Sequence, residues 1–158
     1  MRKDFFEELY RHMKKNKDVW FICGDLGYGW ADKVREDFKD RFINAGAAEQ
    51  AMMNIACGLA IEGKIPFVYS ITTFLLYHPF EVIRNYVNHE NLNVKLIGSG
   101  RDHDYTHEGF SHWSDDAKQT LDLFPNIKQY WPEDKIYIPK IIDEMIDNNT
   151  PAFVSLRR

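Results

Sequence analysis

Apolar runs alternate with amphipathic stretches along most of the chain. Continuous apolar runs are typical of strands buried on both faces of a sheet. We predict strands at residues 19–23, 41–44, 66–71, 94–97, 127–131 and 152–156. Helical spacing or helix-forming composition predicts helices at residues 4–16, 31–39, 48–59, 73–90, 114–124 and 133–148. In the fourth of these, Pro79 is either a first-turn residue or a kink. Gly63 stands where a C-cap of the third helix is expected, and Ser114 is the expected N-cap of the fifth.

Strands that alternate with helices of this length indicate an α/β fold. Right-handed crossovers then give a doubly wound, mainly parallel sheet with helices on both faces. In such folds ligands bind at the carboxyl ends of the strands. We therefore expect a functional site among residues 24–30, 45–49, 71–77, 98–112 and 131–134.

Composition narrows the class of protein. The 158 residues fit one domain, and no repeat or linker divides them. A net charge of −4 argues against a nucleic-acid-binding protein, because phosphate contacts need a basic surface. No apolar run reaches the ~18–20 residues of a membrane span, and the charged start does not resemble a signal peptide. Cys23 and Cys57 stand among apolar neighbours and are interpreted as reduced thiols, so we expect a cytoplasmic protein.

Glu49 is the first candidate for chemistry. It stands at a predicted helix start just past a strand end, among alanine, glycine and methionine residues. Apolar surroundings disfavour the charged carboxylate, so this acid could stay protonated and donate a hydrogen bond. A glutamate in a first helical turn can also simply favour the helix dipole, and that interpretation stays open. The small residues of the same helix fit either packing against a second subunit or an ordinary core helix.

The polar segment after the fourth predicted strand is the second candidate. His103, His107 and His112 fall within ten positions there, together with Arg101 and several acidic residues. The four-residue spacing of His103 and His107 would suit a metal site on a helix, but glycines favour a loop, where that spacing has no geometric meaning. A substrate-binding loop and a merely solvated loop are the other two interpretations.

Two weaker patterns lie at other strand ends. The segment GDLGYG at residues 24–29 resembles a phosphate-binding loop only loosely and also fits a tight strand-to-helix turn. Ile71, Phe74 and Tyr77 recur every three residues directly after a strand. They could clasp a flat ring or form part of the core.

Four segments together carry a more specific pattern. They are RFINAGAAEQAMMNIACGLAIEGKIPFVYSITTFLLYHPFEVIRN, NLNVKLIGSG, EGFSH and LFPNIKQYWPED. In this order and spacing they resemble the pyrimidine-binding domain of the transketolase family. The resemblance covers residues 18–157 of a single domain of residues 1–158, with residues 1–17 as an N-terminal helix. It implies the cofactor thiamine diphosphate.

The resemblance also implies roles for individual residues. Glu49 would hydrogen-bond a ring nitrogen of the cofactor's aminopyrimidine and so activate the cofactor. His112 would polarise a substrate oxygen or exchange a proton with it. The residues expected at the cofactor are Asp25, Glu49, Ile71, Phe74 and Tyr77. At the substrate the resemblance implies Glu108 and His112, and we add Arg101 and His107 as members of the same polar loop.

The family's signature for the diphosphate and its metal is missing from this sequence. Gly24 and Asp25 are followed by leucine, and the adjacent Asn148 and Asn149 lie too far along the chain. We therefore expect a separate diphosphate-binding subunit that holds Mg²⁺ or Ca²⁺, in a two-plus-two heterotetramer. The expected function is that of the pyrimidine-binding subunit of a split transketolase-like transferase that acts on a sugar or keto substrate. A 2-keto-acid decarboxylase or dehydrogenase subunit and a non-catalytic binding module are the alternatives.

Overall fold

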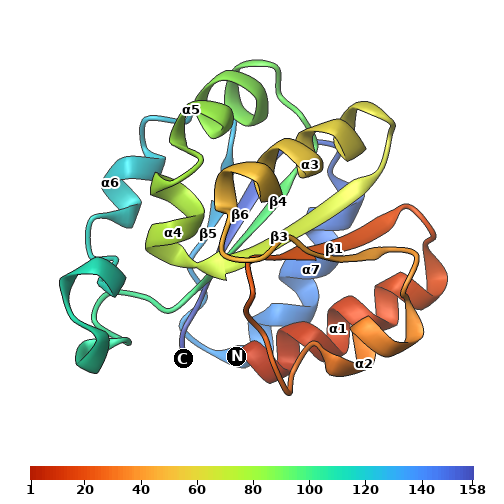
Figure 1. The fold of residues 1–158 in the computed structure, drawn as a ribbon, viewed down its shortest axis with the longest axis horizontal. Helices are drawn as coiled ribbons and strands as arrows, with labels where there is room; N and C mark the ends of the chain where they lie inside the picture. The colour runs from red at the N-terminus through yellow and green to blue at the C-terminus, as the bar shows by residue number, and fades with distance from the viewer.

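The computed structural model describes residues 1–158 and centres on one six-stranded sheet (Figure 1). The strand order is β2-β1-β3-β4-β6-β5, and all neighbouring strands are parallel. The strands are β1 Val19–Cys23, β2 Phe42–Asn44, β3 Ile65–Ile71, β4 Lys95–Ser99, β5 Lys128–Tyr130 and β6 Ala152–Leu156. The predicted parallel α/β sheet is confirmed, and its strand order reverses between β1 and β3.

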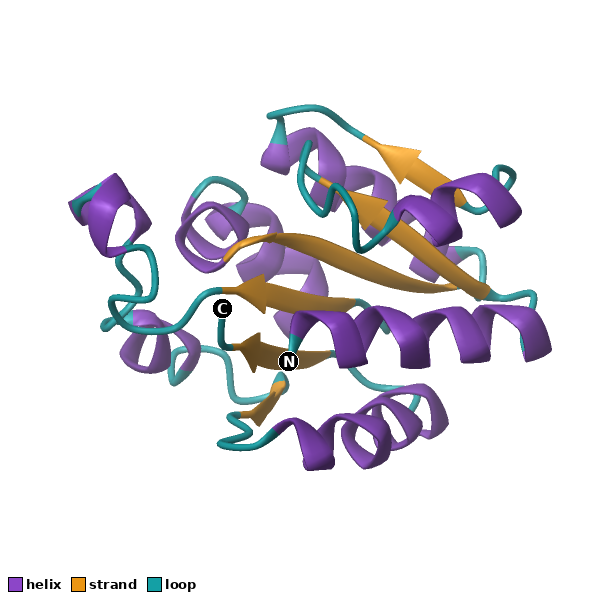
Figure 2. Cartoon of the chain, turned by 90° about the horizontal axis from the view of Figure 1, so that it is seen from below, coloured by secondary structure: helices purple, strands orange, loops and turns teal.

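Helices cover both faces of the sheet, as Figure 2 shows. One layer holds α1 and α7, with α2 beside α1, and the other holds α3 to α6. The α-helices are α1 Arg2–Lys15, α2 Asp32–Asp37, α3 Glu49–Ile61, α4 Thr72–Tyr77, α5 Phe80–Val82, α6 Ala117–Leu121 and α7 Ile138–Asp147. A π-helix spans Ile83–His89, and 3₁₀ turns span Thr106–Glu108, Phe110–His112 and Lys135–Tyr137. None of the helices has the length and apolar character needed to cross a membrane.

The N-terminal helix is part of the core. Phe5, Leu9 and Met13 share one face of α1 and are fully buried against the sheet. Each such side chain contributes roughly 1.5–3 kcal/mol by leaving water. The four-residue spacing of these apolar side chains thus identifies a helix whose burial stabilises the fold.

Gly63 terminates helix α3. Gly63 has a φ of 75°, a conformation that other residues adopt only at a cost. It donates to the carbonyl of Ala60, and Lys64 donates to the carbonyl of Leu59. This hydrogen-bond pair is a Schellman motif, so the predicted cap is confirmed.

The helix predicted at residues 73–90 is divided into three segments, and the first division falls at Pro79, where a kink was one of the two interpretations. Pro79 separates α4 from α5, because proline has no N–H group and its ring crowds the preceding turn. The chain then continues into the π-helix rather than a regular helix. His78 lies at this break, as the C-cap of α4.

Two other predicted helices are shorter than expected. Ser114 does not cap a helix. Its backbone pairs with Asp102 in an isolated bridge, so α6 begins only at Ala117. Before α7, the Asp134 side chain accepts a hydrogen bond from the Ile136 N–H, and the chain makes a 3₁₀ turn first.

Candidate functional site

A polar cluster lies where the strand order of the sheet reverses. Ligands of open α/β sheets bind at this kind of position, outside the carboxyl ends of the strands. β1 ends next to Gly24, β3 carries Ser70 near its end, and α3 begins with Glu49. The Glu49 carboxyl is the only acidic group in the buried part of this cluster.

Glu49 is 5% exposed, and both of its carboxyl oxygens have hydrogen-bond partners. Oε1 accepts a hydrogen bond from the Ser70 hydroxyl at 3.1 Å. Oε2 lies 2.8 Å from Nδ1 of His78. The carboxyl group singled out in the sequence is therefore buried and held by one side chain at each oxygen, Ser70 at Oε1 and His78 at Oε2.

Gly24 leaves room for this carboxyl group. A Cβ atom at position 24 would lie 3.3 Å from Glu49 Oε1, 3.4 Å from Ser70 Oγ and 3.6 Å from the Gly46 carbonyl oxygen. These contacts are tighter than or close to normal packing distances. The glycine is thus needed for space, rather than for a phosphate-binding loop.

Phe74 forms an aromatic surface beside the carboxyl group. The His78 ring lies parallel to it, at an angle of 8° and a centroid distance of 5.1 Å. The His112 ring forms a T-shaped pair with Phe74, with an angle of 66° between the ring planes and 4.9 Å between the centroids. His112 is held by Ser111, whose hydroxyl lies 3.0 Å from Nδ1, and the Ser111 carbonyl accepts a hydrogen bond from Thr73. The structure therefore brings Glu49, Phe74 and His112 together and adds His78.

The side chains of Tyr77 and Ile71 are placed differently from that of Phe74. The Tyr77 hydroxyl lies 3.2 Å from Thr120 Oγ1 on α6. Burial, followed by a hydrogen bond to Asp116, raises the pKa of Tyr77 to about 12. Ile71 ends β3 and is half-buried. Of the three residues at this spacing, Phe74 is the one whose ring pairs with His78 and His112.

Asp25 lies in the turn after β1 with a φ of 53°. Its carboxylate accepts hydrogen bonds from the Tyr28 hydroxyl and the Asn44 side chain, and these bonds lower the pKa of Asp25. Asn44 Oδ1 also accepts hydrogen bonds from the backbone N–H groups of Asp25 and Gly46, both at 3.0 Å. Asn44 thus joins the loop after β1 to the loop before α3.

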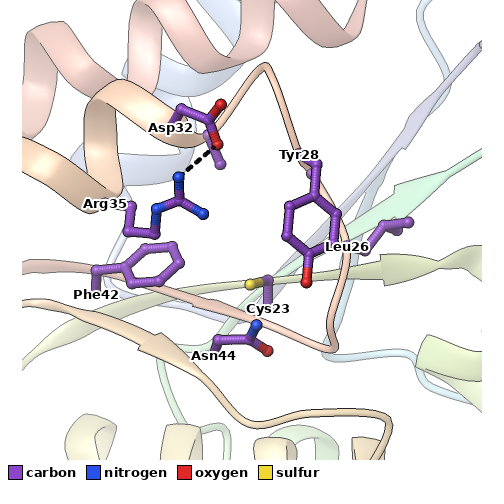
Figure 3. A pocket seen from close by; sticks show the side chains of 9 residues that line it. Cys23, Leu26, Tyr28, Asp32, Arg35, Phe42 and Asn44 are labelled. Carbon is purple, nitrogen blue, oxygen red and sulfur yellow. Dashed lines mark ion pairs between the residues drawn. The ribbon is translucent and has the colours of Figure 1, made fainter.

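The cavity next to this turn is too small for a ligand (Figure 3). It has a volume of about 10 Å³, which is about the space of one water molecule. The Tyr28 ring lies across it from Arg35, which forms an ion pair with Asp32 at 3.1 Å. The candidate site is therefore the Glu49 cluster and not this cavity.

Arg101 is placed differently from its expected role at the substrate. It is 3% exposed, and its guanidinium donates to Ser155, the Pro132 carbonyl and Glu133. All of these partners belong to the protein. The side chain therefore ties the loop after β4 to β6 and to the chain after β5, and these partners occupy its donors.

The remaining loop residues lie at the surface. His107 is exposed, and Glu108 lies 3.7 Å from Arg158 in an ion pair. His103 lies 3.3 Å from Asp115. No three histidine, cysteine, aspartate or glutamate side chains are grouped as metal ligands would be.

Sequence reasoning missed two members of the cluster, His78 and Ser70. Both contact Glu49, from which they are separated by 29 and 21 positions. The proline after His78 was the available signal, because helices usually end at or before the residue preceding a proline. Ser70 lies within an apolar run and gave no comparable signal.

The fold and this cluster define an α/β domain with a candidate ring-binding site where the strand order reverses. The family model "Transketolase, pyrimidine binding domain" matches residues 1–158. The chain belongs to the transketolase family, as its pyrimidine-binding domain.

Relatives and solved structures agree with this assignment. A putative transketolase C-terminal section from Methanocaldococcus jannaschii is 31% identical over all of this chain and 50% of its own length. A 6-deoxy-6-sulfo-D-fructose transketolase subunit from Clostridium sp. is 25% identical over all of this chain and 49% of its own. The solved structure "Split gene transketolase, inactive beta4 tetramer" has a TM-score of 0.87 and 26% identity, covering 99% of this chain and 50% of that one. The chain thus spans about half the length of these relatives.

A transketolase from Campylobacter jejuni has the same fold. Its structure superposes with a TM-score of 0.88 at 19% identity and covers 99% of this chain and 25% of that one. At this level of identity the likeness concerns the fold alone.

Proposed function

We propose that this chain is the pyrimidine-binding part of a split, thiamine-diphosphate-dependent, transketolase-like transferase. Such an enzyme would transfer or form a ketol or acyl unit on a sugar or keto substrate. The observation that carries the proposal is the buried Glu49 carboxyl beside the face of Phe74 and the edge of His112. The split relatives support it.

The cluster is suited to a flat nitrogen heterocycle. A ring already lies parallel to Phe74 with a nitrogen 2.8 Å from Glu49, namely the imidazole of His78. A pyrimidine ring has the same two requirements, an aromatic face and an acidic partner for a ring nitrogen. Glu49 and Phe74 therefore fit the family's cofactor, with Asp25, Ile71 and Tyr77 as more distant candidates.

Each residue has a defined task in this proposal. Thiamine diphosphate, when bound, supplies a nucleophilic carbon that attacks a carbonyl group. Glu49 shares a proton with a nitrogen of the pyrimidine ring, and its burial and its Ser70 partner position it for that purpose. Phe74 holds the ring plane. His112, oriented by Ser111, donates a hydrogen bond or a proton to the substrate oxygen.

The diphosphate and its metal, Mg²⁺ or Ca²⁺, belong in our proposal to a separate subunit. The exposed side of α3 offers the surface for that contact, because it combines Ala51 and Gly58 with the apolar Ile55 and Ile61. Small residues let a neighbouring backbone come close. We propose a two-plus-two heterotetramer in the cytoplasm, in which the cofactor lies between the two kinds of subunit.

A 2-keto-acid enzyme of the same cofactor class is the second candidate. Arg101, the basic group expected at the substrate, is held by protein partners. The cavity of about 200 Å³ beside Tyr77 is lined by the acidic Asp115 and Asp116. Neither feature favours an anionic group on the substrate, whether a phosphate or a carboxylate, so the choice between the two candidates rests on the donor comparison below.

The experiment uses the complex of this chain with the partner that co-purifies with it. Thiamine diphosphate with Mg²⁺ is titrated by calorimetry, and turnover is compared between ketose and 2-keto-acid donors. Glu49→Gln should fold normally and lose activity about 10²–10⁴-fold, because an amide cannot share the proton. Full activity of Glu49→Gln would overturn the mechanism, and a complex that binds no cofactor would overturn the proposal.

A further inference from the structure

We propose that the imidazole of His78 occupies the place of the cofactor's pyrimidine ring in the free chain and must swing out before the cofactor docks. The inference rests on the proposed function, because it assumes that the ring binds between Glu49 and Phe74. It adds a residue that controls how tightly the cofactor binds.

The His78 ring makes both contacts that the proposal gives to the pyrimidine. Its Nδ1 lies 2.8 Å from Glu49 Oε2. Its plane is 8° from that of Phe74, with 5.1 Å between the ring centroids. Aromatic rings that stack have centroids about 4.5–7 Å apart, so a second ring cannot take this pair of contacts while His78 keeps them.

The other groups around Glu49 offer the incoming ring no alternative. Oε1 is held by the Ser70 hydroxyl, and Gly24 lies so close to that oxygen that even a Cβ atom there would be only 3.3 Å from it. The Glu49 side chain is only 6% exposed and cannot turn outward without losing these contacts. The pyrimidine ring must therefore replace the His78 imidazole at Oε2 of Glu49.

His78 is placed where it can leave. Its side chain is 53% exposed, in contrast to the buried carboxyl that it contacts. It is the C-cap of α4, and Pro79 interrupts the helix directly after it. Rotation of the side chain into solvent would break its contact with Glu49 and its stacking on Phe74 but would leave the apolar core in place.

This arrangement lowers the apparent affinity for the cofactor. A ligand that binds only the open form has its affinity reduced by the fraction of molecules that are open. If the imidazole covers the site in about nine-tenths of the molecules, its removal would tighten binding about tenfold. The partner subunit and the diphosphate group would have to supply the free energy of opening.

The test compares variants in the complex with the partner subunit, by calorimetric titration of thiamine diphosphate with Mg²⁺. His78→Ala should lower the dissociation constant by about three- to tenfold. His78→Gln keeps a donor for Glu49 but has no flat aromatic ring, so it should tighten binding by a smaller factor. His89→Ala is the matched control, because His89 is 82% exposed on the following π-helix and should leave the constant unchanged.

The outcomes separate this inference from the proposed function. Tighter binding by His78→Ala, or by His78→Gln if the alanine variant does not fold, supports the displacement of His78. Unchanged or weaker binding in a folded variant overturns it and makes His78 a support of Glu49 instead, while the proposed function stands. A wild-type complex that binds no thiamine diphosphate overturns both.

Discussion

The Ser70 hydroxyl donates a hydrogen bond to Oε1 of Glu49 at 3.1 Å, and both side chains are buried. The bond joins the start of α3 to the carboxyl end of β3, two elements from different parts of the chain. A buried carboxyl that is held on one side by a fixed donor keeps a single orientation. This explains how a strand residue can set the direction of a candidate catalytic acid.

Ser70→Ala should therefore weaken both the fold and the site. The loss of one partner of a buried carboxyl costs about 1–3 kcal/mol of the free energy of unfolding. Urea denaturation of the chain measures that loss. Thr106→Ala is the control, because the Thr106 hydroxyl is exposed and bonds only within its own turn, to the carbonyl of His103. Equal stabilities of the two variants would show that the Ser70 bond contributes nothing.

Much of the fold could be predicted because its signals are local. A strand buried on both faces is a continuous apolar run, and a helix that ends at Gly63 shows its terminus in the sequence. The break at Pro79 also has a local signal, because a proline inside a helical pattern either begins the helix or kinks it.

The site could be predicted only in part, because its contacts join distant positions. Glu49 stood out by its apolar neighbours, Phe74 by its spacing after a strand and His112 by the nearby histidines, and the family resemblance then implied their roles. The contact between His78 and Glu49 spans 29 positions, and the contact between Arg101 and Ser155 spans 54. No local pattern shows which polar side chain the fold will bury, so Arg101 was assigned to the substrate.

Arg101→Lys should destabilise the protein despite keeping the charge. The guanidinium donates to Ser155, to the Pro132 carbonyl and to Glu133 in different directions, which a single ammonium group cannot reproduce. We expect a loss of about 2–4 kcal/mol of the free energy of unfolding, since buried donors and acceptors lose their partners.

Arg157→Lys provides the matched control for that measurement. Arg157 is 39% exposed and forms only long ion pairs, the shortest at 3.4 Å. It should change the free energy of unfolding by less than about 0.5 kcal/mol. If the two lysine variants unfold at the same urea concentration, Arg101 is not the structural tie described above.

Lys95 should make stability rise with pH. It is fully buried at the start of β4, where Nζ donates to the carbonyls of Asn148 at 2.8 Å and Thr150 at 2.6 Å. Burial lowers the pKa of Lys95 to about 7. In the unfolded chain the same group keeps a proton up to about pH 10, so between these values the unfolded state binds more protons. The free energy of unfolding therefore increases with pH, by up to about 1.4 kcal/mol per pH unit.

Lys95→Met should remove this dependence. Urea denaturation at pH 7, 8 and 9 measures the slope in the wild type and in the variant, and their difference isolates the contribution of Lys95. Lys118→Met is the control, because Lys118 is exposed on α6 and should leave the wild-type slope intact. A slope that is the same with and without Lys95 would mean that the buried amine stays charged through this range.

Gly24→Ala should disturb the carboxyl group of Glu49 more than it disturbs the fold. The added methyl group would lie 3.3 Å from Glu49 Oε1 and 3.4 Å from Ser70 Oγ, so both side chains must shift by a few tenths of an ångström. Overpacking of this kind costs about 1–3 kcal/mol. In the complex, the shifted carboxyl group should weaken thiamine diphosphate binding about tenfold, since a lost or bent hydrogen bond of about 1.4 kcal/mol corresponds to that factor.

A double-variant cycle makes this prediction specific. Ser70→Ala removes one of the two atoms that the new methyl group would crowd, so Gly24→Ala should cost less in that background than alone. Residues that share a partner typically show coupling energies of about 0.5–3 kcal/mol, whereas independent sites are additive. Additive losses in urea denaturation would mean that the methyl group acts through the backbone of the β1 turn and not through the oxygen of Glu49 that Ser70 holds.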